Sequence, residues 1–543
     1  MSVERLAKPR LPDTREIGER WEPRPVGLAN ESPSNRTCET AWLARSSLAT
    51  LSGGLVGRVF QGSIQVVLAR LLGPTGYGLY GIGWALVRFA NTVVPFGLNN
   101  GVIHVATQYK TTDHQGKVVR LSLALALVIG GLIGIVVVFA APALSHRVYK
   151  NGGLLSLFLI FALAIPLASG LRIAAAATRV SQSMKYGVYA EYLAQPVSNL
   201  VLIICFYAFG WRLLGAAAAT VISFAIGFAL ALSYIHRLFP AERVVEPAQY
   251  AEIMRGLLQF SLVSWLAVTS VNLVPLIDRL LVGAFLPPAA VGVYQATAQA
   301  SFLFGIIEGA FIAAIAPRFS FLHQSLQLDN LNHMYKVSTR WLAYGCVPFL
   351  LVLCFEPRRV LAALYGISYA SGGRPLIILS VTWFVAAVAS PAGMLLIFTG
   401  RQKIYSLVAG GGLAICILMN LLLIPRFGLA GAAVGTGTAN VAIGLASLLA
   451  VGVKLRMWPW ERQWVKGILA TGTAAVALIL VDHFHLRSAG LDTILLLTIS
   501  AAVFVIALFS LGLDDEDRVM LGTLGGYITA LAGVSNGRIR GGS

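Results

Sequence analysis

Charged residues are scarce in this sequence. Only 12% of its 543 residues are Asp, Glu, Lys or Arg, whereas a soluble protein carries about 25%. The mean hydropathy is +0.76, and apolar runs of 18 or more residues recur along the chain. These runs do not alternate as the strands of a membrane barrel do. They therefore predict α-helices that cross a lipid bilayer.

Motifs of several catalytic classes are also missing. No G-x-x-x-x-G-K-[ST] sequence indicates an ATPase, and no H-E-x-x-H sequence or His/Cys cluster indicates a metal. The five cysteines form no C-x-x-C pair, and four lie in apolar runs, where they act as small apolar side chains. The loops expected on the outer side hold few acids, which disfavours a polymerase or ligase. We expect no enzyme activity, no cofactor and no metal.

The apolar runs predict an all-α polytopic membrane protein with about fourteen spans. The expected spans lie near 46–70, 81–107, 119–141, 154–174, 190–209, 214–235, 258–283, 290–315, 338–355, 376–398, 404–424, 429–452, 465–482 and 491–511. Basic residues in the loops give its orientation. With the N-terminus in the cytoplasm, the inner loops hold 18 Lys and Arg and the outer loops hold 9. Both termini are therefore expected to be cytoplasmic. The net charge of +18 is explained by these loops and by anionic lipid headgroups, so no nucleic-acid partner is expected.

Two weak internal repeats indicate a duplication. "LLGPTGYGLYGIGWAL" (71–86) recurs as "AFLPPAAVGVYQATAQ" (284–299), which pairs Gly78 with Gly292. A second match pairs Gly215 with Gly431 at nearly the same offset along the chain. An even number of spans separates the copies, so both copies share one orientation and predict two similar lobes. The expected parts are a disordered cytoplasmic tail (1–45), an N-lobe of six spans (46–240), a C-lobe of six spans (241–455), an extra helix pair (456–513) and a cytoplasmic tail (514–543).

Polar side chains recur inside the predicted spans. A charge at the bilayer centre costs at least about 2.5–3.5 kcal/mol, so such residues pair with one another, face water or serve function. Several share one helix face, because they are spaced by three, four or seven residues. Arginine binds phosphate through two parallel hydrogen bonds. The candidate residues for binding an anionic substrate are Arg58, Arg88, Arg279, Gln61, Gln65, Asn91, Asn99 and Asn272.

Three carboxylates are candidates for coupling ion movement to transport: Asp278, Glu308 and Glu191. Buried ion pairing, such as Asp278 with a nearby arginine, is the structural alternative. Pro95 lies in the same face as Arg88 and removes a backbone hydrogen bond, which favours a bend.

Two blocks of this sequence resemble a known family. "LARLLGPTGYGLYGIGWALVRFANTVVPFGLNNGVI" (68–103) is similar to the opening helices of polysaccharide flippases of the Wzx type. These belong to the MOP superfamily, with the lipid II flippase MurJ and the MATE exporters. "NLLLIPRFGLAGAAVGT" (420–436) resembles the second recurring block of that family. The 45-residue tail and the last helix pair depart from many Wzx-type members.

The resemblance implies two six-helix lobes around a cationic cavity. It implies transfer of undecaprenyl-diphosphate-linked oligosaccharide from the cytoplasmic to the outer leaflet of a bacterial inner membrane, for exopolysaccharide, O-antigen or capsule. The expected partners are the polyprenyl-diphosphate-linked glycan, membrane lipids and polysaccharide polymerase or export proteins. Three alternatives stay open: a MATE-like cation-coupled exporter, a membrane-embedded polymerase or ligase, and a non-transporting scaffold. The exporter would favour an acidic cavity.

Overall fold

The computed structural model describes most of the predicted spans, apart from some side chains, among them that of Arg58. These residues are helical, without a strand, and ten of their helices are long and apolar enough to cross a membrane. The fold class is confirmed as all-α and polytopic, while the count of fourteen spans and the two tails stay predictions. The described ranges are 33–94, 97–109, 112–181, 184–239, 247–481 and 489–512.

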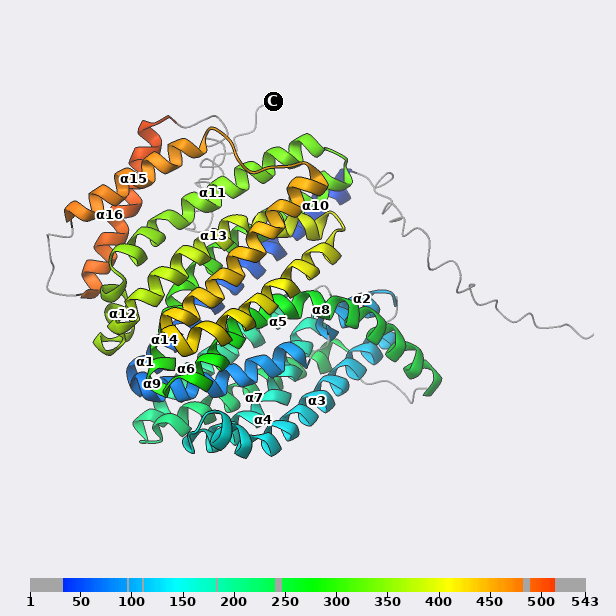
Figure 1. Ribbon diagram of the computed structural model, residues 1–543. Helices are drawn as coiled ribbons and strands as arrows, with labels where there is room; N and C mark the ends of the chain where they lie inside the picture. Colours follow the sequence, from blue (N-terminus) through cyan, green and yellow to red (C-terminus); the bar gives the residue numbers. More distant parts are fainter. Residues whose placement is uncertain are drawn as a thin grey trace, which may run out of the picture. The chain divides into compact units, whose positions relative to one another are not determined.

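Most predicted spans fall within a helix, but the spans 81–107 and 290–315 are each divided between two helices. Figure 1 shows the arrangement of the helices. The names N-lobe, C-lobe and extra pair are kept below for the parts that the sequence predicts. The helices assigned to the predicted N-lobe are α1 (Pro33–Val93), α2 (Leu98–Thr107), α3 (Thr112–Ala143), η2 (Leu144–Val148), α4 (Gly153–Ala177), α5 (Met184–Val188), η3 (Tyr189–Ala194), α6 (Gln195–Ala208) and α7 (Arg212–Leu238). The C-lobe holds α8 (Pro247–Phe285), α9 (Pro288–Ser301), α10 (Leu303–Gln324), α11 (Leu328–Phe355), α12 (Pro357–Tyr365), η4 (Ile367–Gly372), α13 (Gly373–Phe398) and α14 (Gln402–Leu455). The extra pair is α15 (Trp464–Val481) and α16 (Ala489–Ser510).

Two long helices bend where a glycine has a positive φ. In α1 the bend is at Gly73, with φ 65°, and Pro74 follows it. In α14 the bend is at Gly428, with φ 57°. Residues with a Cβ are strained at such angles, so glycine is favoured at both places. Each bend is the short connection between two predicted spans. α14 therefore covers two predicted spans, whereas α1 covers the first span and the part of the second up to Val93.

At one end, the buried apolar side chains of both lobes form a single cluster. At the other end, each lobe has a cluster of its own. Residues 50–543 form one compact unit, and its largest cluster of buried apolar side chains draws on both lobes and on the extra pair. At the other end, one cluster belongs to the N-lobe and the start of α8, and another belongs to the C-lobe. The lobes are therefore packed together firmly at the first end, which we call the joined end.

The two copies of the repeat meet each other at the joined end. A Cβ added to Gly78 would collide with the carbonyl oxygen of Pro288, and a Cβ added to Gly292 would collide with that of Pro74. The contact is reciprocal, since the repeat relates Gly78 to Gly292 and Pro74 to Pro288 by the same shift along the chain. Glycine at both positions lets α1 and α9 cross with their backbones in contact.

Polar contacts close the same end around this crossing. The guanidinium group of Arg70 donates to the carbonyl oxygens of Leu364 (2.9 Å) and Ala363. The hydroxyl group of Tyr369 donates to the carbonyl oxygen of Ala69 at 2.8 Å. These bonds join α1 to the α12–η4 corner of the C-lobe. The reciprocal crossing and these bonds together are called the seam below.

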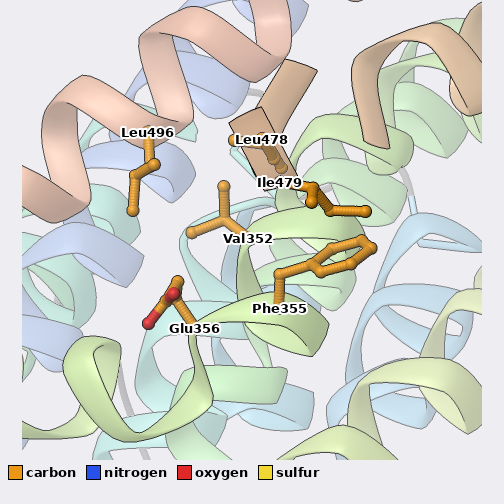
Figure 2. Close-up of a pocket in the computed structure, with 6 residues that line it drawn as sticks. All are labelled: Val352, Phe355, Glu356, Leu478, Ile479 and Leu496. Atoms are coloured by element: carbon orange, nitrogen blue, oxygen red, sulfur yellow. The ribbon is translucent and has the colours of Figure 1, made fainter. Parts of the chain in front are cut away.

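The extra helix pair packs on the C-lobe. α15 and α16 contact each other, and both contact α11 (Figure 1). A pocket of about 80 Å³ lies between them, lined by Val352, Phe355, Glu356, Leu478, Ile479 and Leu496. Figure 2 shows Glu356 as the charged side chain in this otherwise apolar lining. The pocket holds too little space for a sugar headgroup, so the site lies elsewhere.

The linker before α15 forms ion pairs with α11. Glu461 pairs with Lys336 and with the fully buried Arg340, each at 3.3 Å. The hydroxyl group of Tyr344 donates to the carbonyl oxygen of Gln463 at 3.3 Å. These contacts hold the linker against the C-lobe.

Candidate functional site

The site is built around the break between α1 and α2. α1 ends at Val93, and α2 begins after Gly97, whose φ is 77°. Pro95 and Phe96 lie outside the described residues, but proline has no N–H in any conformation. In an unbroken helix the N–H of residue 95 would bond to the carbonyl oxygen of Asn91. The break therefore leaves that carbonyl without its usual helical donor.

Side chains from both lobes supply donors at the break. Arg172 of α4 donates from Nη1 to the carbonyl oxygen of Asn91 at 3.2 Å. Trp265 of α8 donates from Nε1 to the carbonyl oxygen of Val93 at 3.1 Å. The hydroxyl group of Ser169 lies 2.7 Å from Oδ1 of Asn91. The break is thus stabilised by an N-lobe helix on one side and by the C-lobe on the other.

Three arginines gather beside the break. Arg88 lies in the last turns of α1 and interacts electrostatically with Arg279 of α8 and with Arg172 of α4. The side chains of Arg88 and Arg172 are exposed. Arg279 is 7% exposed, and its buried Nε has no hydrogen-bond partner. Like charges repel one another, so an anion bound between these arginines would lower the electrostatic energy of the cluster.

A carboxylate lies behind this cluster, inside the C-lobe. Asp278 is 2% exposed. It accepts hydrogen bonds from the backbone N–H of Arg279 (2.6 Å), the hydroxyl group of Tyr294 (3.0 Å) and that of Thr436 (3.2 Å). The side-chain amide of Asn420 lies 3.5 Å from the Thr436 hydroxyl group. Asp278 is therefore held by neutral donors rather than by an arginine side chain.

The N-lobe contains the same arrangement without the carboxylate. The hydroxyl groups of Tyr80 and Thr220 lie 2.8 Å apart, and Thr220 lies 3.4 Å from Oδ1 of Asn199. The shift that relates Gly78 to Gly292 also relates Tyr80 to Tyr294 and Ile64 to Asp278. The buried Ile64 thus occupies the position of Asp278. Only the C-lobe copy of this arrangement has a charged group.

Some predicted substrate contacts have other roles in the structure. Gln65 is 8% exposed, and its Oε1 accepts from the hydroxyl group of Tyr77 (2.8 Å) and the amide of Gln295 (3.1 Å). It therefore joins α1 of the N-lobe to α9 of the C-lobe. Asn91 uses its carbonyl oxygen and Oδ1 to position Arg172 and Ser169. Both residues thus use these atoms to hold neighbouring side chains in place.

The other predicted contacts stay candidates. Gln61 and Asn272 are exposed and Asn99 is half-buried, so their amides are accessible to a ligand. The side chain of Arg58 lies outside the part that the structure describes. A Cβ on the neighbouring Gly57 would collide with the ring of Tyr192 in η3, which places this turn of α1 against η3.

The two remaining carboxylates lie apart from Asp278. Glu191 is on η3, within electrostatic range of Arg172 and Arg179. Glu308 is on α10 and interacts electrostatically with Cys346 and Tyr405. Within the described ranges, no group of three or more His, Cys, Asp and Glu side chains could hold a metal ion.

Sequence reasoning missed Arg172, which it counted as a loop residue. The signal was present, because Arg172 lies inside the predicted span 154–174 and three residues after Ser169. Trp265 was missed because its partner is a main-chain carbonyl oxygen. A sequence pattern does not show which carbonyl oxygens lack a helical donor.

Comparisons with known proteins agree with this architecture. A family model described as "Polysaccharide biosynthesis protein" matches residues 67–372, which is more than half of the 543 residues. The chain therefore belongs to this family. It is similar to a probable flippase, AglR, of Haloferax volcanii, with 27% identity over 45% of this chain and 52% of that one, about half its length. It is also similar to a putative O-antigen transporter of Shigella flexneri, with 22% identity over 68% of this chain and 87% of that one.

A solved structure shows the same fold. The lipid II flippase MurJ, in an inward closed conformation, matches with a TM-score of 0.69 and 14% identity, over 86% of this chain and 98% of that chain. At this identity the likeness concerns the fold alone. It agrees with the resemblance of the two sequence blocks to the MOP superfamily.

Proposed function

We propose that this protein is a flippase for undecaprenyl-diphosphate-linked oligosaccharides. It would move the repeat unit from the cytoplasmic to the outer leaflet of a bacterial inner membrane, for exopolysaccharide, O-antigen or capsule synthesis. Membership of the polysaccharide biosynthesis family supports this, as do its similarities to a probable flippase and a putative O-antigen transporter. Polysaccharide polymerase and export proteins are the proposed partners, and the protein itself is proposed not to be an enzyme.

The arginine cluster carries the proposal. Arg88 and Arg172 come from the N-lobe, Arg279 comes from the C-lobe, and all three interact through Arg88. A diphosphate would relieve their repulsion and accept charge-assisted hydrogen bonds from planar guanidinium groups. A drug exporter for cations would gain nothing from such a cluster, since its cargo would be repelled. The arginines therefore favour the flippase over the MATE-like alternative.

The closed seam supports the assignment of this structure to a conformation that is closed at its outer end. With the N-terminus in the cytoplasm, as the loop charges predict, the joined end is the outer end. Arg70 and Tyr369 then close the outer side, while the arginines lie toward the end where each lobe has its own core. In this state, substrate would enter from the cytoplasmic leaflet, and rocking of the lobes would open the seam.

Asp278 is the proposed ion-coupling residue. It is buried and surrounded by oxygen and nitrogen atoms of Tyr294, Thr436 and the main chain, and its arrangement has no charged counterpart in the N-lobe. Binding of a cation or proton there would change the charge directly behind Arg279. Glu308 and Glu191 are weaker candidates, because neither is among the groups that act on Asp278.

Translocation in reconstituted vesicles tests the proposal. A fluorescent undecaprenyl-diphosphate-linked saccharide in the inner leaflet should reach the outer leaflet with the wild-type protein. Arg88→Ala and Arg279→Ala should each lower the rate about 10-fold or more, since a charge-assisted hydrogen bond contributes about 1.5–3 kcal/mol. Arg426→Ala removes an exposed arginine of α14 far along the chain from the cluster and should leave the rate unchanged. Equal rates for all three variants would refute the site.

A further inference from the structure

The linker between α14 and α15 alternates buried and exposed side chains. Met457 and Pro459 are buried, whereas Trp458 and Trp460 are 44% and 58% exposed. This alternation is that of an extended chain, in which successive side chains point to opposite sides. One side of the segment is therefore fixed to the C-lobe, and the other side is available to a partner.

Several contacts hold this segment in one conformation. The indole N–H (Nε1) of Trp464 donates to the carbonyl oxygen of Pro459 at 3.1 Å. The ring of Trp458 covers Gly452 so closely that a Cβ there would lie 2.4 Å from a ring carbon atom. Met457 belongs to the apolar cluster of the C-lobe. The outward side chains thus project from an ordered backbone, which lowers the entropy lost when a ligand binds.

The outward side of the segment is basic. Arg456 and Arg462 lie at its two ends and are exposed, and no carboxylate of the described residues pairs with either of them. Glu461, the acidic residue of this linker, is turned inward and pairs with Lys336 and Arg340. The exposed side therefore consists of two tryptophans between two uncompensated arginines. We call this set the basic strip: Arg456, Trp458, Trp460 and Arg462.

The basic strip lies at the boundary of the membrane. It joins two segments that are each long and apolar enough to cross a bilayer, Gln402–Leu455 and Trp464–Val481. A short linker between such segments lies where they leave the hydrocarbon. The strip is at the end where the C-lobe has its own core, which the loop charges predict to be the cytoplasmic end.

From this geometry we infer that the basic strip is a binding site for an anionic phospholipid of the membrane. The lipid phosphate group would accept charge-assisted hydrogen bonds from an arginine, while the tryptophan rings lie at the level of the headgroups, where tryptophan is enriched. A zwitterionic lipid has no net charge to offset the two arginines, so the strip favours an anionic one. The inference goes beyond the proposed function, since this lipid is a resident partner and not the transported cargo.

Basic residues that only orient the protein would not need this arrangement. Orientation depends on how many Lys and Arg residues a loop carries, so any exposed arginine at the cytoplasmic end would serve equally. Arg237 is such a residue, since it is exposed and lies in the last turn of α7 in the N-lobe. A lipid site on the basic strip depends instead on Arg456 and Arg462 in particular.

Lipid titration of the purified full-length protein tests the site, with native mass spectrometry as the readout. The probes are phosphatidylglycerol and phosphatidylcholine with the same acyl chains, and wild-type protein should prefer phosphatidylglycerol. Because a basic residue near an anionic lipid contributes about fivefold in affinity, Arg456→Asn/Arg462→Ala should weaken phosphatidylglycerol about 25-fold and phosphatidylcholine at most about twofold. Asparagine is chosen at residue 456 because its φ is 56°, which asparagine tolerates better than alanine.

Two controls separate the site from general charge and from a structural role. Arg237→Ala should keep the wild-type preference, and Arg456→Lys/Arg462→Lys should keep most of it, because both charges remain. Excess inorganic phosphate should leave bound phosphatidylglycerol in place, since the tryptophans contact the lipid and not its phosphate alone.

Four results would overturn the inference. An unchanged preference in Arg456→Asn/Arg462→Ala would show that the strip binds no lipid, and equal weakening of both lipids would show a structural role. An equal loss in Arg237→Ala would show general charge attraction, and displacement by phosphate would show a site for the ion. None of these results bears on the proposed flippase, because the arginine cluster lies on other helices.

Discussion

Alanine at the reciprocal glycine crossing should force the seam open. A Cβ at Gly78 would overlap the backbone of Pro288, which cannot move aside as a flexible side chain can. Overpacking of this kind costs about 1–3 kcal/mol, and it destabilises only the state in which the helices touch. Since each factor of ten corresponds to about 1.4 kcal/mol, Gly78→Ala should raise the population of opened seam by about 5- to 150-fold.

A buried reporter at the seam measures this population. Ala69 is 1% exposed, and its carbonyl oxygen is bonded to Tyr369. Ala69→Cys, in a chain whose five native cysteines are replaced by alanine, should react with a membrane-impermeant thiol reagent only when the seam opens. Gly78→Ala should accelerate this labelling, and Gly292→Ala should do so to a similar extent because the contact is reciprocal.

Two comparisons can refute this reasoning. A Cβ on Gly131 of α3 would meet no atom within 4 Å, so Gly131→Ala should leave the labelling rate unchanged. The double variant Gly78→Ala/Gly292→Ala should fall short of additivity, because helices that one methyl group has already separated resist the second less. Unchanged labelling in Gly78→Ala, or strict additivity in the double variant, would show that the crossing does not hold the seam.

Two further predictions concern charged groups. Asp278→Asn should abolish the dependence of vesicle translocation on an ion gradient, while diphosphate binding stays within about threefold of wild type. The side chain of Asp278 is bonded to the hydroxyl groups of Tyr294 and Thr436 and to the backbone N–H of Arg279, and not to a guanidinium group that would hold the diphosphate. Gradient-dependent transport in this variant would remove it as the coupling residue. Glu461→Gln should lower the melting temperature of the purified protein more than Glu356→Gln does. The first change removes a carboxylate from the buried Arg340 and leaves its guanidinium group without that partner, at about 1–3 kcal/mol. The second breaks a partly exposed pair with Arg359, worth at most about 1 kcal/mol.

Periodicity and composition predicted the helices well. The apolar runs predicted the bounds of α3, α4, α7 and α13 to within about seven residues, because length and hydropathy decide whether a segment spans a bilayer. The run 338–355 missed the first ten residues of α11, which begins at Leu328. The frame of Gly78 and Gly292 was found from the repeat alone, and the structure shows the two residues in reciprocal contact. The sequence could not show that the copies touch, since a repeat carries no information about distance.

The site was predicted less completely than the fold. Spacing placed Gln61 and Gln65 on one face of α1, but a helix face four residues long extends about 6 Å along the axis. Over that distance α1 passes from an exposed stretch to the contact with Gln295 of α9, so Gln61 is exposed and Gln65 is buried. Arg172 was missed for a related reason: its significance depends on the carbonyl oxygen of Asn91, which belongs to another helix.

The position of the crossing along α1 has a mechanical consequence. Arg88 follows Gly78 by ten residues, or about 15 Å of helix. A rotation of about 15° between lobes, as in other rigid-body transitions, would move Arg88 by only about 4 Å if the seam stayed closed and the crossing were the pivot. Groups farther from the crossing would move in proportion to their distance from it. While the seam is closed, the arginines thus lie on the short arm of a lever, where a headgroup can stay bound as the opposite end widens or narrows.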